Sequence, residues 1–335
     1  MQVYEIRDEF GLDHLVRVER PQPEPSSTEL LVKMRAWSLN YRDLLTVTGQ
    51  YNPRMPLPRV PLSDGVGEVV AAGNAVTRVN VGDRVAGIFL QDWIEGEISP
   101  DKTNSDLGGG IDGVLAEYVL FNEQGVVRVP EHLSDEEAAT LPCAAVTAWN
   151  ALVEDDRVKP GETVLLLGTG GVSLFALQFS RLLGARAIIT SKSDEKLSRA
   201  ADLGAWETIN YATTPEWYKR VLELTEGRGV DHVVEVGGSG TLPQSLRAVR
   251  VGGRISLIGI LGGVGEMNPL PIVMRRLRVQ GIYVGSGASF EAMNNAIASS
   301  GLRPVIDKTF GFDEAVEALR YLESGAHFGK IVIRR

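Results

Sequence analysis

Hydrophobic and polar positions follow the clearest pattern in residues 163–191, TVLLLGTGGVSLFALQFSRLLGARAIITS. An unbroken apolar run at 164–167 predicts a strand that is covered on both faces, as in a parallel sheet. After a glycine turn, apolar residues recur at every third or fourth position, which predicts a helix with one face packed on that sheet. Residues 188–190 predict a second strand, so the stretch forms a right-handed strand–helix–strand unit.

The turn after the first strand contains Gly168, Gly170 and Gly171. At the start of a helix, such a turn presents free backbone N–H groups that bind a dinucleotide pyrophosphate. The sixth position of G-x-G-x-x-G is Ser173 instead of Gly or Ala, so the prediction depends on the strand before the turn and the helix after it. The alternatives are a plain tight turn and a membrane span over the uncharged residues 163–180, which the central glycines argue against.

Predicted strands and helices alternate from residue 160 onward. Helical periods at 193–203, 215–225 and 242–250 separate apolar strand segments. The alternation predicts six strands, the number in a doubly wound dinucleotide-binding fold. These strands contain or adjoin Val164, Ala187, Thr208, His232, Arg254 and Arg278.

Glycines stand where several of these strands end, at Gly168, Gly237, Gly238 and Gly259. Ligands of such sheets lie at the carboxyl ends of the strands, and glycine allows the backbone to approach a ligand closely. Ordinary turns after strands also favour glycine, so both interpretations stand.

The first part of the chain is rich in strand signals separated by Pro and Gly turns, and this pattern predicts a small irregular barrel. Residues 91–112 lack periodicity and are expected to form a loop. Ser134 and Glu137 form a capping box ahead of an apolar helix, at which the chain leaves the first domain. The strands are predicted at 30–34, 67–72, 85–89 and 116–121.

The last part of the chain predicts a helix, a strand, a second helix and a second strand. Its two strands are expected to return to the first domain. The four elements lie at 290–300, 305–310, 313–324 and 330–333.

Composition narrows the functional classes. The 335 residues are 44% hydrophobic and 23% charged, which is typical of a globular protein of two domains. A net charge of -9 without a basic run disfavours nucleic acid and anionic membranes as partners and favours a small-molecule substrate. The beginning of the chain, MQVYEIRDEFG, lacks the apolar block of a secretion signal, so we expect a cytoplasmic protein. Cys143 is the only cysteine, which excludes an internal disulfide and a Cys-rich zinc site.

Six stretches of the sequence resemble the medium-chain dehydrogenase/reductase superfamily, and its zinc-free quinone oxidoreductase branch is the most similar. The resemblance implies an α/β protein with a GroES-like β-barrel catalytic domain at 1–130 and 287–335 and a six-stranded doubly wound Rossmann domain at 131–286. The stretches are VKMRAWSLNYRDLLTVTGQY (32–51), PLSDGVGEVVAAG (61–73), GDRV (82–85), LPCAAVTAWNAL (141–152), GTGGV (168–172) and FGKIVI (328–333).

Zinc-dependent members of this superfamily hold a catalytic metal with Cys, His and Cys. By the resemblance, these positions fall on Asn40, Ser63 and Cys143. One thiolate does not provide the three protein ligands of such a site, so no metal is expected. Residues 91–110 also lack the four cysteines of the family's structural zinc lobe. Cys143 is then expected to be a small buried residue, with the alternative of a nucleophile.

Without a metal, neutral hydrogen-bond donors must hold the substrate oxygen. The resemblance places Asn40, Tyr41, Tyr51 and Thr147 near the nicotinamide. Such donors contribute a few kcal/mol each, less than a dication. A quinone or an α,β-unsaturated carbonyl spreads the incoming charge and needs less help than an alcohol, so we expect reduction of these substrates. Alternatively, Asn40 only bridges backbone groups in a turn, and the tyrosines only cover an apolar pocket.

The resemblance also suggests a substrate pocket with Tyr51, Asp64 and Phe89, although Phe89 suits the core equally well. Asp43 and Asp64 are expected to orient the donors. Arg42 stands where many zinc alcohol dehydrogenases have a proton-relay hydroxyl, which puts that relay in doubt. The four histidines have no metal-ligand spacing and are expected on the surface or in loops: His14, His132, His232 and His327.

The second predicted strand ends on Ser191, where NAD enzymes place Asp or Glu. Lys192, Lys196 and Tyr211 add cations and a donor that suit a 2′-phosphate, whereas Asp194 opposes it unless it only begins a helix. NADPH is therefore favoured over NADH. The remaining cofactor contacts are expected from Thr147, Gly168, Gly170, Gly171, Val172, Gly237, Ile258, Gly259 and Lys330.

Residues 278–284, RVQGIYV, are predicted to form the edge strand of the sheet. An uncovered edge favours pairing with a second copy, so a homodimer is expected, with a tetramer as the alternative. Two other functions are considered: a zinc-free NAD(P)-dependent alcohol dehydrogenase or carbonyl reductase, and a cofactor-binding protein without catalysis.

Overall fold

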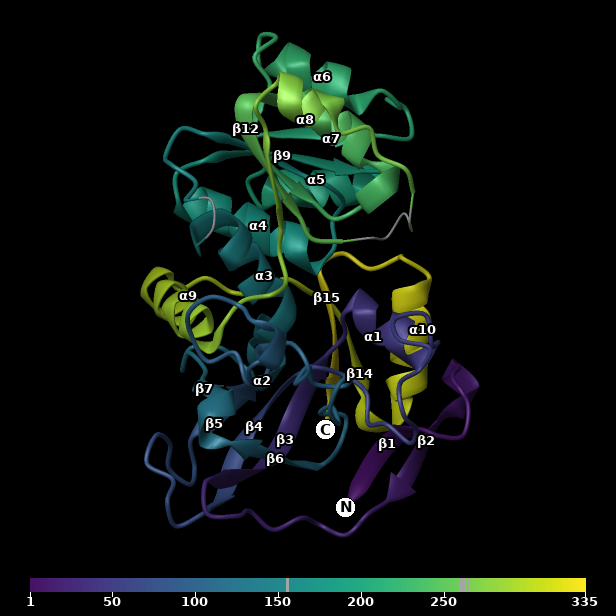
Figure 1. Ribbon diagram of the computed structural model, residues 1–335, viewed down its shortest axis with the longest axis vertical. Helices are drawn as coiled ribbons and strands as arrows, with labels where there is room; N and C mark the ends of the chain where they lie inside the picture. The colour runs from purple at the N-terminus through teal and green to yellow at the C-terminus, as the bar shows by residue number, and fades with distance from the viewer. Residues whose placement is uncertain (155–156, 260–262, 264) are drawn as a thin grey trace. The chain divides into compact units, whose positions relative to one another are not determined.

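The computed structural model describes residues 1–154, 157–259, 263 and 265–335. The chain forms two compact units (Figure 1). Unit 1 comprises Met1–Val146 and Gly285–Arg335, and unit 2 comprises Thr147–Val284.

The division falls after Val146 instead of at residue 130, where the sequence placed it. Helix α2 (Asp135–Ala139) packs against strands β3 (Glu29–Ser38) and β4 (Asp64–Ala72), so the segment after residue 130 belongs to unit 1. The expected capping box begins this helix, because Ser134 N–H donates to Glu137 Oε2 at 2.8 Å and Glu137 N–H donates to Ser134 Oγ at 3.2 Å.

The sheet of unit 1 contains strands from both ends of the chain. Its described strands follow the order β14-β15-β3-β4-β5-β7, and β6 also pairs with β3. β14 and β15 are parallel, whereas β15 is antiparallel to β3, so the strands of the chain's end return to the first unit as expected. The strands besides β3 and β4 are β5 (Arg84–Gly87), β6 (Tyr118–Asn122), β7 (Val126–Arg128), β14 (Ile306–Gly311) and β15 (Lys330–Arg334), and a separate hairpin pairs β1 (Gln2–Ile6) with β2 (Leu15–Glu19).

The helices of unit 1 pack around this sheet (Figure 1). α10 contacts α1, β14 and β15, and α9 contacts β7. The predicted loop at 91–112 has one short 3-10 turn, Pro100–Lys102, and Lys102 Nζ closes it by donating to the carbonyl oxygens of Glu95 and Glu97. Besides α2, the helices are α1 (Tyr41–Val47), α9 (Gly287–Ser300) and α10 (Ala315–Glu323).

Unit 2 is a doubly wound α/β fold. Its described strands form one parallel sheet in the order β10-β9-β8-β11-β12-β13, which confirms the predicted fold class and places β13 at an edge. Figure 1 shows α4 on one side of this sheet and α6, α7 and α8 on the other. The strands are β8 (Thr163–Leu166), β9 (Arg186–Ser191), β10 (Glu207–Asn210), β11 (Val230–Glu235), β12 (Val249–Leu257) and β13 (Arg278–Gly281), and the helices are α3 (Val146–Trp149), α4 (Gly171–Leu182), α5 (Asp194–Asp202), α6 (Trp217–Leu224), α7 (Leu242–Ala248) and α8 (Leu270–Met274).

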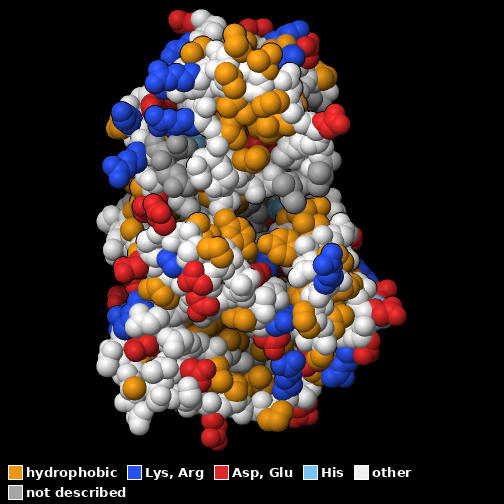
Figure 2. All heavy atoms as spheres, viewed as in Figure 1, with side chains coloured by type: hydrophobic (Ala, Val, Ile, Leu, Met, Phe, Trp, Pro, Cys, Tyr) orange, Lys and Arg blue, Asp and Glu red, His pale blue; other side chains and the backbone are white. Residues whose placement is uncertain are grey.

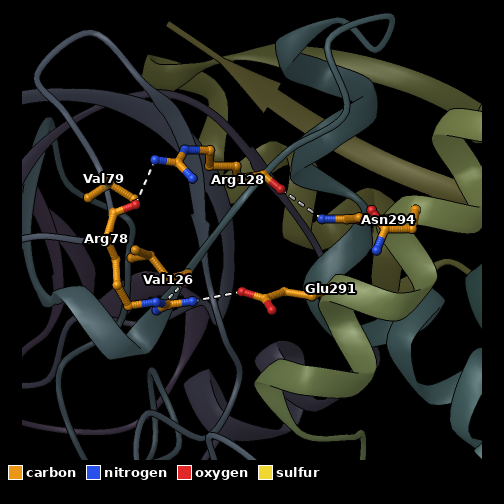
Figure 3. A pocket seen from close by; sticks show the side chains of 7 residues that line it. Arg78, Val79, Val126, Arg128, Glu291 and Asn294 are labelled. Atoms are coloured by element: carbon orange, nitrogen blue, oxygen red, sulfur yellow. Dashed lines mark hydrogen bonds and ion pairs between the residues drawn. The ribbon is translucent and has the colours of Figure 1, made fainter.

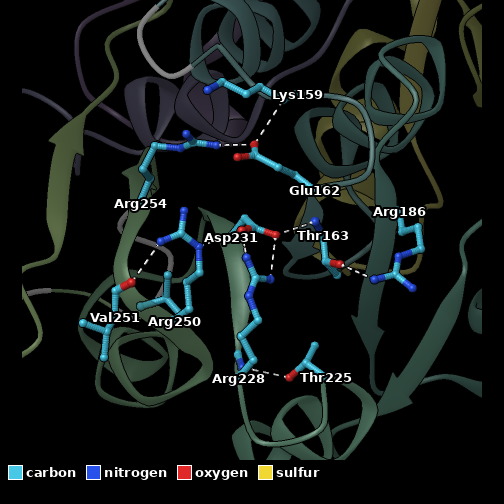
Figure 4. A network of polar contacts seen from close by, with 12 residues as sticks. Lys159, Glu162, Thr163, Arg186, Thr225, Arg228, Asp231, Arg250, Val251 and Arg254 are labelled. Atoms are coloured by element: carbon cyan, nitrogen blue, oxygen red, sulfur yellow. Dashed lines mark hydrogen bonds and ion pairs between the residues drawn. The ribbon is translucent and has the colours of Figure 1, made fainter.

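A polar network joins the strands of unit 2 at their amino ends (Figure 4). The buried carboxylate of Asp231 accepts hydrogen bonds from the Thr163 N–H at 2.9 Å, from Arg250 Nε at 2.7 Å and from both terminal nitrogens of Arg228. Parallel sheets of this kind bind ligands at the carboxyl ends of their strands. This network stabilises the opposite, amino ends of the strands.

His232 lies inside the sheet, so the expectation that it occupies the surface or a loop is wrong. It is fully buried in β11, and its Nε2 atom lies 2.8 Å from Ser256 Oγ. A parallel strand covered by helices on both faces buries every residue, including a polar one.

Among the described residues, the helices are too short or too polar to cross a membrane.

Candidate cofactor and active sites

The glycine turn of unit 2 has the geometry of a phosphate-binding turn. Gly168 has a φ of +74°, a conformation that side chains disfavour, and Gly171 begins α4. A Cβ atom added at Gly168 or Gly170 would meet nothing within 4 Å. The first N–H groups of a helix have no partner within it, so the open space beside this turn fits an anion such as a pyrophosphate.

Ser173 explains how the turn departs from G-x-G-x-x-G. Its side chain is buried between helix and strand, and its Oγ donates to the carbonyl oxygen of Leu167 at 2.6 Å. A serine is small enough for the close contact of helix and strand that the motif requires, and this bond satisfies its hydroxyl.

The residues predicted to select the cofactor gather at the carboxyl ends of β9 and β10. Ser191 is buried at the end of β9, and its carbonyl oxygen accepts a hydrogen bond from the Tyr211 N–H at 3.0 Å. The Tyr211 side chain is exposed, as is Lys192, and the Lys196 N–H donates to Ser193 Oγ at the start of α5. These side chains therefore share one end of the sheet with the glycine turn.

Asp194, the residue that opposes a 2′-phosphate, has a local partner. Its Oδ1 atom accepts a hydrogen bond from Asn210 Nδ2 at 2.6 Å. Ser193 caps α5, so Asp194 also occupies the first turn of that helix, where a carboxylate is favourable. The hydrogen bond from Asn210 and the position in the first turn of α5 both indicate that Asp194 stabilises the local fold.

The glycines after β11 and β12 are needed for contacts within the protein. A Cβ atom on Gly259 would lie 2.1 Å from the carbonyl oxygen of Val236, and one on Gly237 would lie 2.2 Å from Thr241 Oγ1. Glu235, which the sequence did not single out, is fully buried and accepts from the N–H groups of Gly237 and Gly238 at 2.8 and 3.1 Å. Close packing thus accounts for these glycines, and their contacts with a cofactor, together with that of Ile258, stay predictions.

The candidate active site of unit 1 is organised around Lys330. This lysine is the first residue of β15, and its side chain is 3% exposed. Its Nζ atom donates to the carbonyl oxygen of Leu39 and to Asn40 Oδ1, both at 2.6 Å, and lies 3.9 Å from Asp64 Oδ2. The predicted contact of Lys330 with cofactor phosphates stays a prediction, and it would compete with these two acceptors.

Asp64 brings the other residues of this site together. It accepts from Ser63 Oγ at 2.7 Å and from the Cys143 N–H at 3.2 Å. Burial raises the pKa of Asp64, while Lys330 and the surrounding donors lower it. Asn40, Ser63 and Cys143, which stand at the metal-ligand positions of the zinc enzymes, therefore surround one ion pair. Asp64 has no exposed surface, so it supports the site instead of lining a pocket as the sequence suggested.

Asn40 and Asp43 fix the start of α1. The Asn40 N–H donates to Asp43 Oδ2 at 2.8 Å, and the Asp43 N–H donates to the Asn40 carbonyl oxygen at 2.9 Å. Burial raises the pKa of Asp43 to about 6, against the lowering effect of Arg42. The side-chain oxygen of Asn40 accepts a hydrogen bond from Lys330, and Asn40 is also the N-cap of α1 in a capping box with Asp43, so both interpretations of this residue stay open.

Cys143 lies beside these carboxylates. Burial raises the pKa of its thiol well above the ordinary value, and Asp64 raises it further. The thiol therefore stays protonated at neutral pH, which disfavours an activated nucleophile, while its side chain is only partly buried and not fully buried as the sequence predicted.

The donors at the three ligand positions do not fit a tetrahedral zinc centre. The Asn40 oxygen is bound to an ammonium group, the Ser63 hydroxyl donates to Asp64, and Cys143 is the only thiol at the three positions. Zinc requires a deprotonated thiolate and would be repelled by Lys330. Within the described residues, His, Cys, Asp and Glu form no group of three that suits a metal ion.

Arg42 connects α1 to the loop at 91–112. Its guanidinium donates to the Leu107 carbonyl oxygen at 2.6 Å and to Asp106 at 2.5 Å. It also stacks on two of the predicted pocket residues, 5.0 Å from the ring centre of Tyr51 and 4.8 Å from that of Phe89. Ion pairing and stacking thus hold the loop that in zinc relatives contains the structural metal.

The three other predicted donors differ in exposure. Tyr41 and Tyr51 are 42% and 39% exposed, so neither ring is sequestered in a core. Thr147 is buried in α3, four residues after Cys143 in one continuous helical segment. The described structure does not test whether these hydroxyls contact a substrate, and their roles stay predictions.

A separate cavity of about 430 Å³ lies in unit 1, away from all predicted site residues. Figure 3 shows Arg78 pointing toward Glu291 and Asn294 pointing toward the Arg128 carbonyl oxygen, with distances of 2.7 and 2.9 Å. These contacts attach α9 to the loop between β4 and β5 and to the last residue of β7. The cavity is lined by Arg78, Val79, Val126, Arg128, Glu291, Asn294 and Asn295.

Two family models match the two halves of the chain. The alcohol dehydrogenase GroES-like domain matches residues 26–131, and the zinc-binding dehydrogenase domain matches residues 171–299. A zinc-type alcohol dehydrogenase-like protein of Schizosaccharomyces pombe is 44% identical, over 99% of this chain and 98% of its own. A quinone oxidoreductase of Pseudomonas aeruginosa is 31% identical, over 97% of each chain.

Solved structures agree with this assignment. A putative alcohol dehydrogenase from Sinorhizobium meliloti has a TM-score of 0.93 with 42% identity, over 100% of this chain and 98% of its own. An NAD-dependent alcohol dehydrogenase (TM-score 0.91, 34% identity) and a mycobacterial protein complexed with NADPH (TM-score 0.85, 27% identity) each cover 100% of both chains.

A GroES-like unit joined to a doubly wound dinucleotide-binding unit defines a class of nicotinamide-dependent oxidoreductases. The chain belongs to the medium-chain dehydrogenase/reductase superfamily, as its sequence motifs implied.

Proposed function

We propose that this protein is a zinc-independent reductase that transfers hydride from NADPH to a quinone or an α,β-unsaturated carbonyl. The observation that carries the proposal is the buried contact of Lys330 with Asn40 and Asp64, which lies among the residues at the three metal-ligand positions of zinc dehydrogenases. The resemblance of the sequence to zinc-free quinone oxidoreductases supports the same substrate class.

The cofactor would be held by the glycine turn and the residues at the carboxyl ends of β9 and β10. When bound, it supplies the hydride. The backbone N–H groups of Gly171 and Val172, at the start of α4, would bind the pyrophosphate, and the open space at Gly170 would accommodate it. Ser191 and Lys192 provide a hydroxyl and a cation for a 2′-phosphate without a competing carboxylate at the strand end. The pairing of Asp194 with Asn210 supports this preference for NADPH.

Asn40 and Thr147 are proposed to donate hydrogen bonds to the acceptor oxygen or to the nicotinamide ribose, and Tyr41 and Tyr51 to orient the substrate. Hydride addition to a conjugated carbonyl leaves negative charge on its oxygen. Preorganised donors stabilise this charge, and a proton then neutralises it. A conjugated acceptor spreads the charge and so needs no metal.

The proposal includes a homodimer. Strand β13 is at the edge of the described unit 2 sheet, and the helix just before it in the chain, α8, has side chains that are more than half exposed, Leu270, Val273 and Met274. Figure 2 shows apolar side chains gathered on this face of unit 2. An open strand edge beside an apolar surface favours pairing with a second copy. Sedimentation equilibrium tests this assembly and its tetrameric alternative.

The test of function is a screen in which the absorbance of reduced nicotinamide is followed with quinones, enones and alcohols, using both cofactors. We expect NADPH to be consumed with a quinone or an enone at the same rate before and after treatment with a strong chelator. Loss of activity on chelation, restored by zinc, would contradict the proposal.

The second candidate is a zinc-free alcohol dehydrogenase, which is favoured by the names of the S. pombe and S. meliloti relatives. Steady oxidation of a simple alcohol by the chelated protein would favour it. Cofactor binding without turnover of any compound in the screen would favour a non-catalytic protein.

A further inference from the structure

The contact between Lys330 and Asn40 fixes the orientation of the asparagine amide. An ammonium group can only donate hydrogen bonds, so the atom 2.6 Å from Lys330 Nζ has to be the amide oxygen. The oxygen and the nitrogen of the amide are therefore told apart by their hydrogen-bond partner. The NH₂ group of Asn40 consequently points away from the lysine.

The NH₂ group of Asn40 lacks a good acceptor. Its nitrogen is buried and has no hydrogen-bond partner of normal geometry among the described residues. A weak side-chain hydrogen bond from Asn40, outside normal geometric limits, lowers the pKa of Asp64, and the second N–H of the amide has no acceptor among the described residues. Buried donors without acceptors are rare in proteins, and they occur where a ligand supplies the acceptor.

The ammonium group of Lys330 also places a positive charge beside the amide oxygen of Asn40. A hydrogen bond from a cation polarises the carbonyl oxygen and strengthens the donor at the other end of the amide. Asp64 Oδ2 is 3.9 Å from Lys330 Nζ, so it balances the charge without displacing Asn40 from the ammonium.

We propose that Lys330 is a positioning residue of the reaction, which holds the Asn40 NH₂ group toward the acceptor oxygen and supplies positive charge behind it. The inference rests on the proposed function in that Asn40 contacts that oxygen. No bond to Lys330 forms or breaks in the reaction. In this arrangement the cation acts through one neutral amide, where zinc enzymes place a metal directly on the oxygen.

The test uses 4-nitrophenol, whose phenolate is coloured and mimics a substrate oxygen with negative charge. The holoprotein with bound NADP⁺ is titrated with pH in the presence of the probe, and the pKa of the bound phenol is read from its absorbance without turnover. We expect the wild-type protein to lower this pKa by about one unit relative to water. The shift should be lost in Lys330→Met and Asn40→Leu, and it should be reduced in Lys330→Gln, which keeps a neutral donor.

Activity provides a second readout. With a quinone, kcat should fall about tenfold to hundredfold in Lys330→Met with a smaller change in KM, because the lost interaction forms as charge develops. Lys219→Met, at an exposed lysine of α6 paired with Glu216, is the matched control and should change neither readout.

Lys330→Met leaves Asp64 without its partner and is expected to lower stability. The double variant Lys330→Met/Asp64→Asn restores a neutral pair and replaces the single variant if that fails to fold. Thermal unfolding is measured for each protein, so a loss of the phenol shift in a stable variant is assigned to the site.

An unchanged phenol pKa in Lys330→Gln and in the double variant would overturn the inference, as would a wild-type protein that binds the probe without any shift or does not bind it. The two proposals fail separately. Quinone turnover with a titration that is independent of Lys330 would remove the positioning role alone. A titration that depends on Lys330 in a protein without reductase activity would remove the proposed function and keep the positioning role.

Discussion

Lys330 Nζ lies 2.6 Å from Asn40 Oδ1, although 290 positions separate the two residues in the sequence. The antiparallel pairing of β15 with β3 brings them together, because β3 ends at Ser38, opposite Val332. The sequence suggested a site of neutral donors only. The structure places a buried cation, Lys330, beside one of these donors, and no sequence pattern indicated this contact.

Asn40→Asp tests the NH₂ group of this amide separately from its oxygen. The new carboxylate keeps an oxygen on Lys330 but removes the NH₂ donor. We expect kcat with a quinone to fall about a hundredfold, as when one oxyanion donor is removed, with little change in thermal stability. Asn52→Asp, at an exposed asparagine whose Oδ1 accepts from the Arg54 N–H, is the control. Full activity of Asn40→Asp would show that the amide does not contact the substrate.

Ser191→Asp tests the cofactor preference. A carboxylate at the end of β9 would repel a 2′-phosphate and would bind the ribose hydroxyls of NADH. We expect the Kd for NADPH to rise about tenfold to hundredfold, with a small change or a gain for NADH, measured by quenching of tryptophan fluorescence. Ser99→Asp in unit 1 adds the same charge at a partly exposed cap of a short 3-10 turn and should leave both affinities unchanged. Equal losses for both cofactors would contradict the placement of the phosphate.

His232 makes the folded protein sensitive to acid. Burial, with a smaller effect of Arg254, lowers its pKa to about 3 from an ordinary 6.5. Between these values the unfolded chain binds a proton that the folded chain does not, so this stability is intact above pH ~6.5 and is lost progressively as the pH falls toward 3. At pH ~5 the loss should be about 2 kcal/mol.

Urea unfolding at several pH values tests this effect. His232→Gln should show a smaller decrease in unfolding free energy between neutral and mildly acidic pH than the wild-type protein. His14→Gln, at a half-exposed histidine, should retain the wild-type decrease. An identical pH dependence of His232→Gln and wild type would contradict the assignment.

Asp231 contributes stability with a different pH window. Although burial alone raises its pKa, hydrogen bonds from Arg228, Thr163 and Arg250 lower it to about 2. The carboxylate therefore stabilises the folded state above the unfolded value near 4, and this contribution is lost as the pH falls toward 2.

Asp231→Asn should reduce the free energy of unfolding by about 2 kcal/mol at neutral pH. The difference from wild type should shrink as the pH is lowered through the interval between 4 and 2. Asp13→Asn, whose carboxylate is exposed and paired with Arg320, should have little effect at any pH. A difference that stays constant with pH would assign the loss to packing instead of charge.

Local sequence patterns predicted much of the fold. The apolar run before Gly168, the helical spacing after it and the second strand all lie where they were expected, since each depends on neighbours within one turn or one strand. The capping box of Ser134 and Glu137 is likewise a local interaction. The predicted edge position of β13 is confirmed because strand order in a doubly wound sheet follows from the alternation of strands and helices.

Other features required contacts that no local pattern encodes. The burial of His232 depends on both faces of the sheet, and the need for Gly259 depends on the backbone of Val236, which directly follows the neighbouring strand β11. Glu235 was missed because its donors come from the turn that follows it. Its only signal in the sequence is a carboxylate between a strand and two glycines.

The sequence by itself determined the two kinds of unit, the phosphate-binding turn and the family, because hydrophobic spacing and motifs are properties of short segments. Only the tertiary structure decided which charged residues lie beside the positions of the lost metal ligands. Strand pairing between the two ends of the chain buries Lys330 against Asn40 and Asp64, and burial makes these charges depend on one another.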